Sequence, residues 1–371
     1  MIRSIHRTLF ISKRYASSGR AIVYSSYGNP IETVKLIRYE VPEPAKDQVQ
    51  VKLLAAPINP ADINQIEGVY PSRPEMTTDE LGSSEPVAVG GNEGVFQVVK
   101  VGKDVTGIRP GDWAIPRGSN LGTWRTVGNF AANALIAIDP FGLSKVQAAT
   151  VSVNPTTAFM MLSQFVKLQA GDWFIQNAGN SGVGRAAIQL GRLWGLNSIS
   201  VVRDRPDIED LMKELADLGA THVMTESQLS NRAQAATIKQ WTAGAPVRLG
   251  FNGVGGPSST NIARQLANGG HLVTYGGMSK QPVTFPTSLF IFKNITAHGF
   301  WLSRHIEQHA GEKEAAVQAI LKLYRSGQFT ATKAIEHIIE DEQITDEQFE
   351  GAFKRALKGY FEGGKHLIVV G

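Results

Sequence analysis

A glycine-rich stretch near the middle of the chain has residue types and spacing suited to binding a pyrophosphate. Residues 172–190 read DWFIQNAGNSGVGRAAIQL, a short apolar run followed by a loop with three glycines and then by good helix formers. This order predicts a strand, a tight turn and a helix whose first N–H groups and positive dipole end point at one place. The outer glycines of the dinucleotide-binding fingerprint are matched by Gly179 and Gly184. Ser181 stands where the middle glycine is expected, and Gly182 follows it. The predicted phosphate-binding residues are Gly179, Asn180, Ser181, Gly182 and Val183.

The strand predicted next along the chain ends in residues that distinguish the two nicotinamide cofactors. Residues 199–202 are rich in β-branched side chains and lie about twenty residues after the loop. At this strand end an acidic residue binds the ribose 2′-hydroxyl of NAD, whereas arginine accommodates the 2′-phosphate of NADP. Here Arg203, Asp204 and Arg205 follow the strand, and two guanidinium groups favour a phosphate. A solvated basic turn that binds nothing is the alternative. Together with the loop, these residues predict NADPH as the cofactor.

Residue types elsewhere exclude several other kinds of chemistry. The 371 residues include no cysteine, which excludes disulfides, thiolate catalysis and cysteine-ligated zinc. No Gly-x-Ser-x-Gly sequence occurs, so a hydrolase of the nucleophile-elbow type is not expected. No apolar run approaches the roughly twenty residues that cross a bilayer, and we expect no membrane span.

The elements that must position these residues change character along the chain. Residues 21–140 contain short β-rich runs separated by Gly and Pro, which predict a compact β domain. Beyond Ser144, helical stretches alternate with apolar strands near residues 173, 199, 223, 248, 271 and 295, which predicts a six-stranded, doubly wound parallel sheet. The last segment contains Thr345 and Gln348 as a capping box, then a helix and a strand at 367–370. We expect this tail to return to the β domain.

The first thirty residues differ in composition from the rest of the chain. They contain no acidic residue, and the arginines at 3, 7 and 14 share one helical face while Ile2, Ile5 and Leu9 fall on another. This pattern predicts a mitochondrial transit peptide, residues 1–15, and a location in the mitochondrial matrix. A disordered basic tail is the alternative. Four of the 37 basic residues lie in residues 1–15, so 33 basic and 33 acidic residues remain in the rest of the chain. The net charge is therefore no argument for nucleic acid.

Motifs spread over most of the chain give it a specific resemblance. They are INPADINQIEGVYPSRP at 58–74, GGNEGV at 90–95, VSVNPTTA at 151–158, QNAGNSGVG at 176–184, VVRDR at 201–205, TYGGMSKQPV at 274–283 and GFW at 299–301. With these the chain resembles the medium-chain dehydrogenase/reductase superfamily. Within it, the chain is similar to the mitochondrial 2-enoyl thioester reductases of fatty acid synthesis. The resemblance implies NADPH-dependent reduction of the C2=C3 double bond of trans-2-enoyl thioesters carried by coenzyme A or acyl carrier protein.

The same resemblance implies the domain organisation and the absence of a metal. We expect an α/β protein with a GroES-like, β-rich catalytic domain at 20–142 and 319–371 and a Rossmann doubly wound, NADPH-binding domain at 143–318. Zinc alcohol dehydrogenases hold their metal with cysteines and the histidine of a Gly-His-Glu motif. In this chain Asn92 takes that histidine position. No metal is expected, so side chains must polarise the substrate and supply the proton.

Tyr70, in the sequence GVYPSRP, matches the catalytic tyrosine of these reductases. A phenol is protonated at neutral pH and can donate a hydrogen bond or a proton to a thioester enolate. Without the flanking motif, an aromatic side chain packed in a loop beside Pro71 is the more ordinary interpretation.

Further residues are assigned to the cofactor by the resemblance. Asn154 is expected there, with a helix N-cap as the alternative or additional role. The segment Tyr275, Gly276, Gly277 and Met278 follows a predicted strand and is expected beside the nicotinamide, as are Phe300, Trp301 and Leu302. Trp301 also borders the acyl channel in this interpretation. Lys365 corresponds to a lysine that reaches the cofactor, against a solvated turn as the alternative.

Two other functions and one partner remain open. An NADPH:quinone reductase of the same superfamily also lacks zinc, although Tyr70 and the GFW sequence favour the enoyl reductases. A non-catalytic nucleotide-binding protein of mitochondria is the third possibility. Family analogy suggests a homodimer, for which the apolar run Phe285 to Phe292 would form edge structure. A plain buried strand is the alternative for that run.

Overall fold

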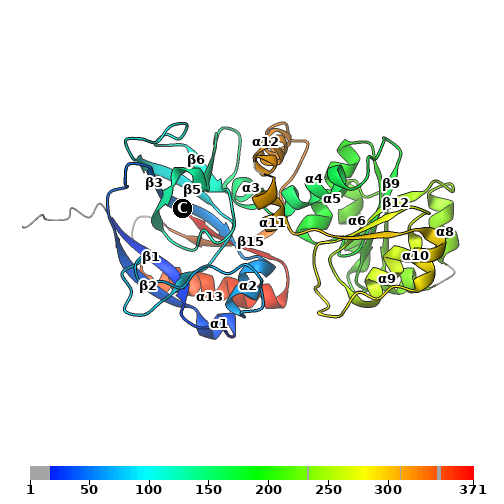
Figure 1. Ribbon diagram of the computed structural model, residues 1–371, viewed down its shortest axis with the longest axis horizontal. Coiled ribbons are helices and arrows are strands. Elements are labelled where there is room, and N and C mark those ends of the chain that lie inside the picture. The colour runs from blue at the N-terminus through cyan, green and yellow to red at the C-terminus, as the bar shows by residue number, and fades with distance from the viewer. Residues whose placement is uncertain (1–16, 232–233, 310, 341–343) are drawn as a thin grey trace, which may run out of the picture. The chain divides into compact units, whose positions relative to one another are not determined.

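The computed structural model describes residues 17–231, 234–309, 311–340 and 344–371, and the chain forms two compact units (Figure 1). Unit 1 contains the residues up to Phe141 and those from Ile335 to Gly371, and unit 2 contains Gly142–Ala334. The expected transit peptide, residues 1–15, lies outside the described residues. Unit 2 extends beyond residue 318, where we expected the chain to return to the first domain. The reason is that helix α12 (Glu312–Arg325) packs against α4 (Asn154–Gln164) of unit 2.

Unit 1 is built on two sheets. A three-stranded sheet has the order β2-β1-β4, and a seven-stranded sheet has the order β15-β16-β3-β5-β6-β8, with β7 also paired to β3. The strands are β1 (Ser17–Tyr24), β2 (Lys35–Val41), β3 (Gln48–Pro57), β4 (Ala88–Val89), β5 (Val95–Val101), β6 (Trp113–Pro116), β7 (Val127–Ala131), β8 (Leu135–Ile138), β15 (Ala334–Ile339) and β16 (Lys365–Val370). The helices are α1 (Pro30–Thr33), α2 (Pro60–Ile66) and α13 (Asp346–Glu362), with a 3-10 turn at Ala132–Ala134. The β-rich runs expected over residues 21–140 are present, and they include β1, β3, β5 and β8.

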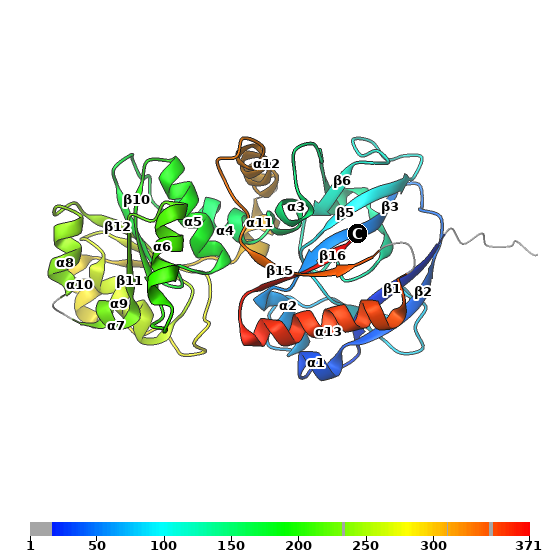
Figure 2. The same cartoon turned by 180° about the vertical axis from the view of Figure 1, so that it is seen from behind.

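Helix α13 closes the core of unit 1. Thr345 and Gln348 form the expected capping box at its start. Its apolar face is fully buried at Phe349, Ala352, Phe353 and Ala356. The helix packs against β16 and β1 (Figure 2). The ring of Phe353 lies 5.3 Å from that of Trp124, which covers the backbone at Gly90 and Gly91 so closely that neither glycine could carry a side chain. The tail therefore returns to unit 1 as expected, and β16 pairs with β3 in antiparallel register.

Unit 2 contains the predicted six-stranded parallel sheet, in the order β11-β10-β9-β12-β13-β14. The strands are β9 (Trp173–Gln176), β10 (Asn197–Val202), β11 (His222–Thr225), β12 (Val247–Asn252), β13 (His271–Thr274) and β14 (Thr296–Gly299). The other helices are α3 (Lys145–Thr150), α5 (Gly182–Leu193), α6 (Ile208–Leu218), α7 (Glu226–Ser230), α8 (Gln234–Trp241), α9 (Gly256–Gln265), α10 (Thr287–Lys293) and α11 (Leu302–Gln308).

Both faces of this sheet are covered by helices, as a doubly wound fold requires (Figure 1). On one face Ile188 of α5 and Leu215 of α6 pack on Val202. On the other face Ile262 of α9 and Leu289 of α10 pack with Ile199. Because all six strands are parallel, their carboxyl ends lie at the same end of the sheet, where a ligand crevice is expected.

Two local expectations differ from the structure. The helical stretch expected at 145–168 is two helices, α3 and α4, separated at 151–153. The run from Phe285 to Phe292 is neither an edge strand nor a buried strand. It forms α10, which begins after Pro286 and ends at Asn294 in a left-handed conformation with φ of 47°. One of the two edge strands of the sheet is β14, directly after this helix, and the other is β11. Among the described residues, no helix is both long and apolar enough to cross a membrane.

The packing of α13 gives a stability prediction. Phe353→Ala removes a fully buried ring from the core of unit 1 and should lower the free energy of unfolding by about 3–5 kcal/mol. Phe361→Ala, in the same helix, is the matched control because that ring is 53% exposed. Chemical denaturation of both variants measures the difference, and equal losses would contradict this account of the core.

Candidate active site

The glycine-rich loop between β9 and α5 packs against its surroundings backbone to backbone. A Cβ on Gly184 would lie 2.6 Å from the carbonyl oxygens of Ala178 and Gly179. A Cβ on Gly179 would lie 2.9 Å from Cβ of Ser200 on the neighbouring strand β10. The sharp turn itself is made by Ala178, whose φ is 49°, and not by the first glycine as expected. Gly179 is required by the close approach of β10 and not by a left-handed backbone.

Helix α5 begins at this loop in a form suited to an anion. Ser181 is the N-cap, and its hydroxyl accepts a hydrogen bond of 3.1 Å from the backbone N–H of Gly184. The first turn of this twelve-residue helix carries no acidic side chain. The N–H groups of its first turn and its dipole would therefore attract a pyrophosphate. The residues present thus fit a dinucleotide.

Asn154 lies against this loop within unit 2. It is the first residue of α4, and the helix N-cap is Val153, so the N-cap role considered for Asn154 is wrong. Its side-chain nitrogen lies 2.6 Å from the point that a Cβ on Gly182 would occupy. Gly182 therefore allows the amide of Asn154 to approach the start of α5. The structure brings together Asn154 and the residues 179–183, as the assignment to one cofactor requires.

A chain of polar side chains crosses the carboxyl ends of β9, β12 and β13. Asn177, fully buried, donates to Asn252 at 2.8 Å and to the hydroxyl of Ser258 at 2.9 Å. Asn252, also fully buried, donates to Thr274 at 3.2 Å. Ser258 in turn donates to Glu226 at 2.6 Å. These bonds hold the loops at the strand ends in fixed positions. Sequence analysis missed them, since an isolated asparagine after a strand gives no distinctive signal.

The segment after β13 borders the same edge. Burial raises the pKa of Tyr275 to about 12, against the lowering effect of its hydrogen bond with the Ser181 side chain. Gly276 lies on the backbone of Gly253, whereas Met278 is 63% exposed. Tyr275 thus joins the glycine-rich loop to the strand end, while Gly277 and Met278 reach solvent.

The aromatic segment after β14 divides into a core residue and two partly exposed ones. Phe300 is 7% exposed, and its ring packs edge-on against Phe165 at 6.0 Å. It therefore belongs to the packed interior of unit 2. Trp301 and Leu302 begin helix α11 and remain half-buried. Their expected place beside the nicotinamide stays a prediction.

The residues expected to bind the 2′-phosphate follow β10 directly and are exposed. Arg205 forms an ion pair of 3.7 Å with Asp207. Asp204 accepts hydrogen bonds from the backbone N–H of Ser227 at 3.1 Å and from its hydroxyl. The Ser227 hydroxyl is the main cause that lowers the pKa of Asp204. The three residues therefore lie together at the strand end, but the carboxylate is bound to a neighbouring loop.

Lys365 begins β16 in unit 1 and is not in a solvated turn. Its side chain is 11% exposed and donates to the side-chain oxygen of Asn59 at 2.5 Å. It also lies 4.0 Å from the carboxylate of Glu93, which is fully buried and accepts from Asn59 at 2.8 Å. Burial lowers the pKa of Lys365, against the raising effect of Glu93 and Asp62. This cation sits in a polar interior that sequence analysis did not foresee.

Asn92 is the centre of that interior. Its amide nitrogen donates to Asp62 at 2.7 Å and to Gln65 at 2.6 Å, and its oxygen accepts from the backbone N–H of Asn120 at 2.8 Å. Burial raises the pKa of Asp62 to about 6, against the lowering effect of the hydrogen bonds from Asn92 and from the backbone of Asn59. The position of the metal-binding histidine in zinc dehydrogenases is thus occupied by an amide whose nitrogen and oxygen are both hydrogen-bonded to neighbouring protein groups.

The same contacts support the loop that carries Tyr70. Gln65 donates to the carbonyl oxygen of Ser72 at 2.9 Å, and Asn120 donates to the Ser72 hydroxyl at 2.9 Å. The backbone N–H of Tyr70 donates to the carbonyl of Asn64 at 3.1 Å. Tyr70 is half-buried. It therefore stands on a loop anchored to buried groups, which is a suitable setting for a positioned phenol.

Two other features involve residues outside the predicted site. His305 of α11 and His309, the C-cap of that helix, stand at helical spacing with Glu312 nearby, and the ring of His305 lies 5.5 Å from that of Phe300. Nevertheless, no group of three or more His, Cys, Asp and Glu side chains in the described part of the chain could hold a metal ion.

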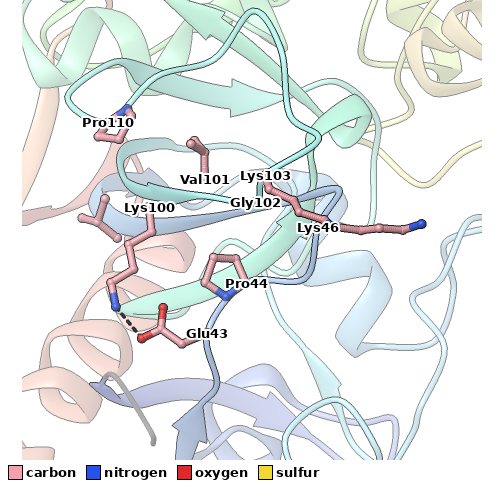
Figure 3. Close-up of a pocket in the computed structure, with 9 residues that line it drawn as sticks. Glu43, Pro44, Lys46, Lys100, Val101, Gly102, Lys103 and Pro110 are labelled. Atoms are coloured by element: carbon pink, nitrogen blue, oxygen red, sulfur yellow. Dashed lines mark hydrogen bonds and ion pairs between the residues drawn. The ribbon is translucent and has the colours of Figure 1, made fainter.

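The second feature is a surface groove of about 570 Å³, with Glu43, Lys46, Lys100 and Lys103 among its lining residues (Figure 3). Lys100 pairs with Glu43 at 2.7 Å. The groove lies at the start of β3, whereas Asn59 follows its end, and ten extended residues span about 30 Å. The groove is therefore remote from the polar interior.

Tyr70 and Lys365 belong to unit 1, and the other predicted site residues belong to unit 2. Two family models match parts of the chain, the first covering unit 1 residues and the start of unit 2, the second lying within unit 2. The model described as "Alcohol dehydrogenase GroES-like domain" matches residues 45–163, and the one described as "Zinc-binding dehydrogenase" matches residues 182–322.

Individual relatives match nearly the whole chain. A mitochondrial enoyl-acyl-carrier-protein reductase of Yarrowia lipolytica is 48% identical over 372 residues, which cover 100% of this chain and 96% of the relative. A solved structure described as the complex of Etr1p with NADP and crotonyl-CoA has a TM-score of 0.90 and 42% identity, covering 95% of this chain and 100% of that one. The mitochondrial 2-enoyl thioester reductase Etr1p/Etr2p heterodimer from Candida tropicalis matches with the same TM-score, identity and coverage.

The buried carboxyl group of Asp62 gives a prediction about pH. Its pKa in the folded protein, about 6, lies above the ordinary value of 3.8, so its contribution to stability is present at low pH and is lost as the pH rises through 6. Asp62→Asn removes this dependence. Between pH 4 and pH 7, the free energy of unfolding of the variant should rise by up to about 3 kcal/mol relative to that of the unsubstituted protein. A pH-independent difference between the two proteins adds to this change.

Urea unfolding of both proteins at several pH values measures this gain. Asp79→Asn, at an exposed position, is the control and should show a constant difference. A constant difference for Asp62→Asn as well would mean that Asp62 is not desolvated as described.

Proposed function

The chain belongs to the family of mitochondrial enoyl-acyl-carrier-protein reductases, and from this membership we propose that it uses NADPH to reduce the C2=C3 double bond of trans-2-enoyl thioesters. The observation that carries the proposal is the buried network around Asn92. Asn92 takes the position of the zinc-binding histidine of related dehydrogenases, and its network supports the Tyr70 loop. The quinone reductase and the non-catalytic alternative are not favoured, because the whole-length relative is an enoyl reductase.

Unit 2 is the proposed NADPH-binding domain. When bound, NADPH supplies the hydride that is added to the β carbon of the enoyl thioester. The N–H groups at the start of α5 hold the pyrophosphate, and Asn154 packs against them through Gly182. Arg203 and Arg205 pair with the 2′-phosphate, which is doubly charged and outcompetes the long, exposed contact of Arg205 with Asp207. Residues 275–278, with Phe300, Trp301 and Leu302, complete the proposed cofactor contacts of unit 2, and Lys365 of unit 1 is proposed as a further contact.

Unit 1 is the proposed catalytic domain. Addition of a hydride to the β carbon places negative charge on the thioester oxygen and the α carbon. The Tyr70 hydroxyl donates a hydrogen bond to that charge and delivers a proton. Gln65 and Asn120 act on this step only by fixing Ser72, two residues along the loop. The polarising group is therefore an ordinary phenol with a fixed backbone.

The protein acts in mitochondria, as the relatives' names and the composition of the first thirty residues both indicate. We place it in the matrix, with residues 1–15 as the transit peptide. The acyl carrier is coenzyme A or acyl carrier protein, both of which present the same pantetheine arm.

We further propose that the chain forms a homodimer through unit 2. Strand β14 is one edge strand of the six-stranded sheet and is mostly exposed. The preceding helix α10 exposes Ile291 by 67% and Phe292 by 77%. An unpaired strand edge beside exposed apolar side chains is suited to a two-fold contact with a second copy. Support comes from the heterodimer of the two Candida tropicalis reductases.

The proposed dimer contact predicts that a charged substitution in α10 lowers the mass of the protein in solution. Phe292→Glu places a charge in the proposed contact and should convert the dimer to a monomer in sedimentation experiments. Ile338→Glu is the control, because Ile338 is 64% exposed but belongs to unit 1. A monomeric parent protein, or a Phe292→Glu variant that sediments as a dimer, would rule out this contact.

The catalytic role of Tyr70 predicts a specific loss of turnover. Tyr70→Phe removes only the hydroxyl and should lower kcat on trans-2-hexenoyl-CoA by on the order of a hundredfold while NADPH binding persists. Tyr27→Phe is the matched control, since Tyr27 lies in the same unit beside Gly68. NADPH oxidation is followed with the thioester and, separately, with a small quinone. Turnover of the quinone alone would overturn the proposed function, whereas undiminished thioester turnover by Tyr70→Phe would remove only Tyr70 from the mechanism.

A further inference from the structure

An acidic side chain stands between the two arginines proposed to bind the 2′-phosphate. Asp204 follows β10 at the strand end where NAD-dependent proteins use a carboxylate to bind ribose hydroxyls. An unrestrained carboxylate here would repel a phosphate or pair with Arg203 and Arg205. Either effect would weaken binding of NADPH relative to NADH.

The structure shows where this carboxylate is held. One oxygen of Asp204 accepts from the backbone N–H of Ser227 at 3.1 Å, and the other accepts from the Ser227 hydroxyl. Ser227 lies on α7, which follows the neighbouring strand β11. Both carboxylate oxygens are thus engaged by Ser227 of α7, and the Thr225 side chain also hydrogen-bonds to the carboxylate.

Ser227 is itself fixed by its surroundings. Its hydroxyl lies 2.9 Å from that of Thr225, the N-cap of α7, and Thr225 forms a capping box with Gln228. The partner that receives Asp204 is therefore already in position before any cofactor arrives. A loose serine would not restrain a carboxylate at an exposed strand end.

The other carboxylate at this edge is also engaged. Glu226 accepts from Ser258 at 2.6 Å, and burial raises its pKa, with a further raising effect from Asp204. Neither Asp204 nor Glu226 is directed to the arginines by these contacts, whereas Asp207 forms the 3.7 Å ion pair with Arg205. Arg203 and Arg205 remain exposed at the end of β10.

We infer that Ser227 is a specificity-determining residue for the cofactor: it holds the Asp204 carboxylate on α7, so that Arg203 and Arg205 are available to the 2′-phosphate of NADPH. This inference rests on the proposed use of NADPH. It adds that the preference depends on a residue of the neighbouring βα loop as well as on the two arginines. Ser227 acts through Asp204 and need not touch the cofactor.

The test measures binding of NADPH and NADH to the full chain by fluorescence titration, with no thioester present. Ser227→Ala frees one carboxylate oxygen and should lower the ratio of NADPH to NADH affinity by about tenfold. In an Asp204→Asn background the same substitution should change the ratio by less than twofold, because no carboxylate remains to be released. A variant in which both Arg203 and Arg205 are replaced shows the largest decrease in the NADPH to NADH affinity ratio that loss of the phosphate contacts can cause.

Ser230→Ala is the matched control. Ser230 lies on the same short helix and donates to the carbonyl of Ser227 at 2.8 Å, but it does not contact Asp204 by any described hydrogen bond. It should leave the ratio unchanged. Thermal unfolding of each variant confirms that the exposed helix is still folded.

The outcomes are distinct. A ratio unchanged in Ser227→Ala, or a loss that persists in the Asp204→Asn background, overturns the role of Ser227 and leaves the enoyl reductase function intact. A parent protein that binds NADH as tightly as NADPH overturns both the inference and the proposed cofactor, and thioester turnover with NADH then decides the reaction separately.

Discussion

Asn92 donates two hydrogen bonds to buried acceptors, Asp62 and Gln65, and accepts one from the backbone of Asn120. Amide donors and acceptors removed from water must be paired, and here the pairings join Asn92 to α2 and to the loop at Asn120. Asp62 caps α2, and Gln65 and Asn120 fix the loop of Tyr70. A carboxylic acid or imidazole at residue 92 would not supply the same set of donors and acceptors. The rest of the candidate active site in unit 1 depends on this amide.

In unit 2 the candidate cofactor site is held in place mainly by close backbone contacts. The loop at 177–184 approaches its neighbours so closely that a Cβ at Gly184 would overlap two carbonyl oxygens. Asn177 and Asn252 then bind the strand ends to one another. A rigid strand edge of this kind presents N–H groups without a cost of reorganisation when an anion binds. The two units therefore reach preorganisation by different means, side-chain amides in one and glycine backbone in the other.

The sequence predicted the six parallel strands, the capping box of α13 and the loop at 179–184, because each has a local pattern of period, cap or glycine spacing. It did not predict α10, since a short apolar run that starts beside prolines fits a strand as well as a helix. It also missed Asn59, Asp62 and Gln65 as a group, although all lie in one motif. Their significance comes from contacts with Asn92, Asn120 and Lys365, which are distant in sequence and appear only after folding. The resemblance supplied Tyr70 and Lys365, which composition and spacing alone would have left among ordinary loop residues.

The pairing of β16 with β3 has a consequence for the order in which the chain can fold. Unit 2 is continuous in sequence, whereas unit 1 needs residues from both sides of it. During synthesis or passage through a membrane pore, the residues of unit 2 are all available before β16 emerges, and domains generally fold as units. Until then the first 141 residues lack the strand that carries Lys365 and the helix that covers Trp124. Their apolar surface is exposed for that interval and is the part of the molecule on which a chaperone would act.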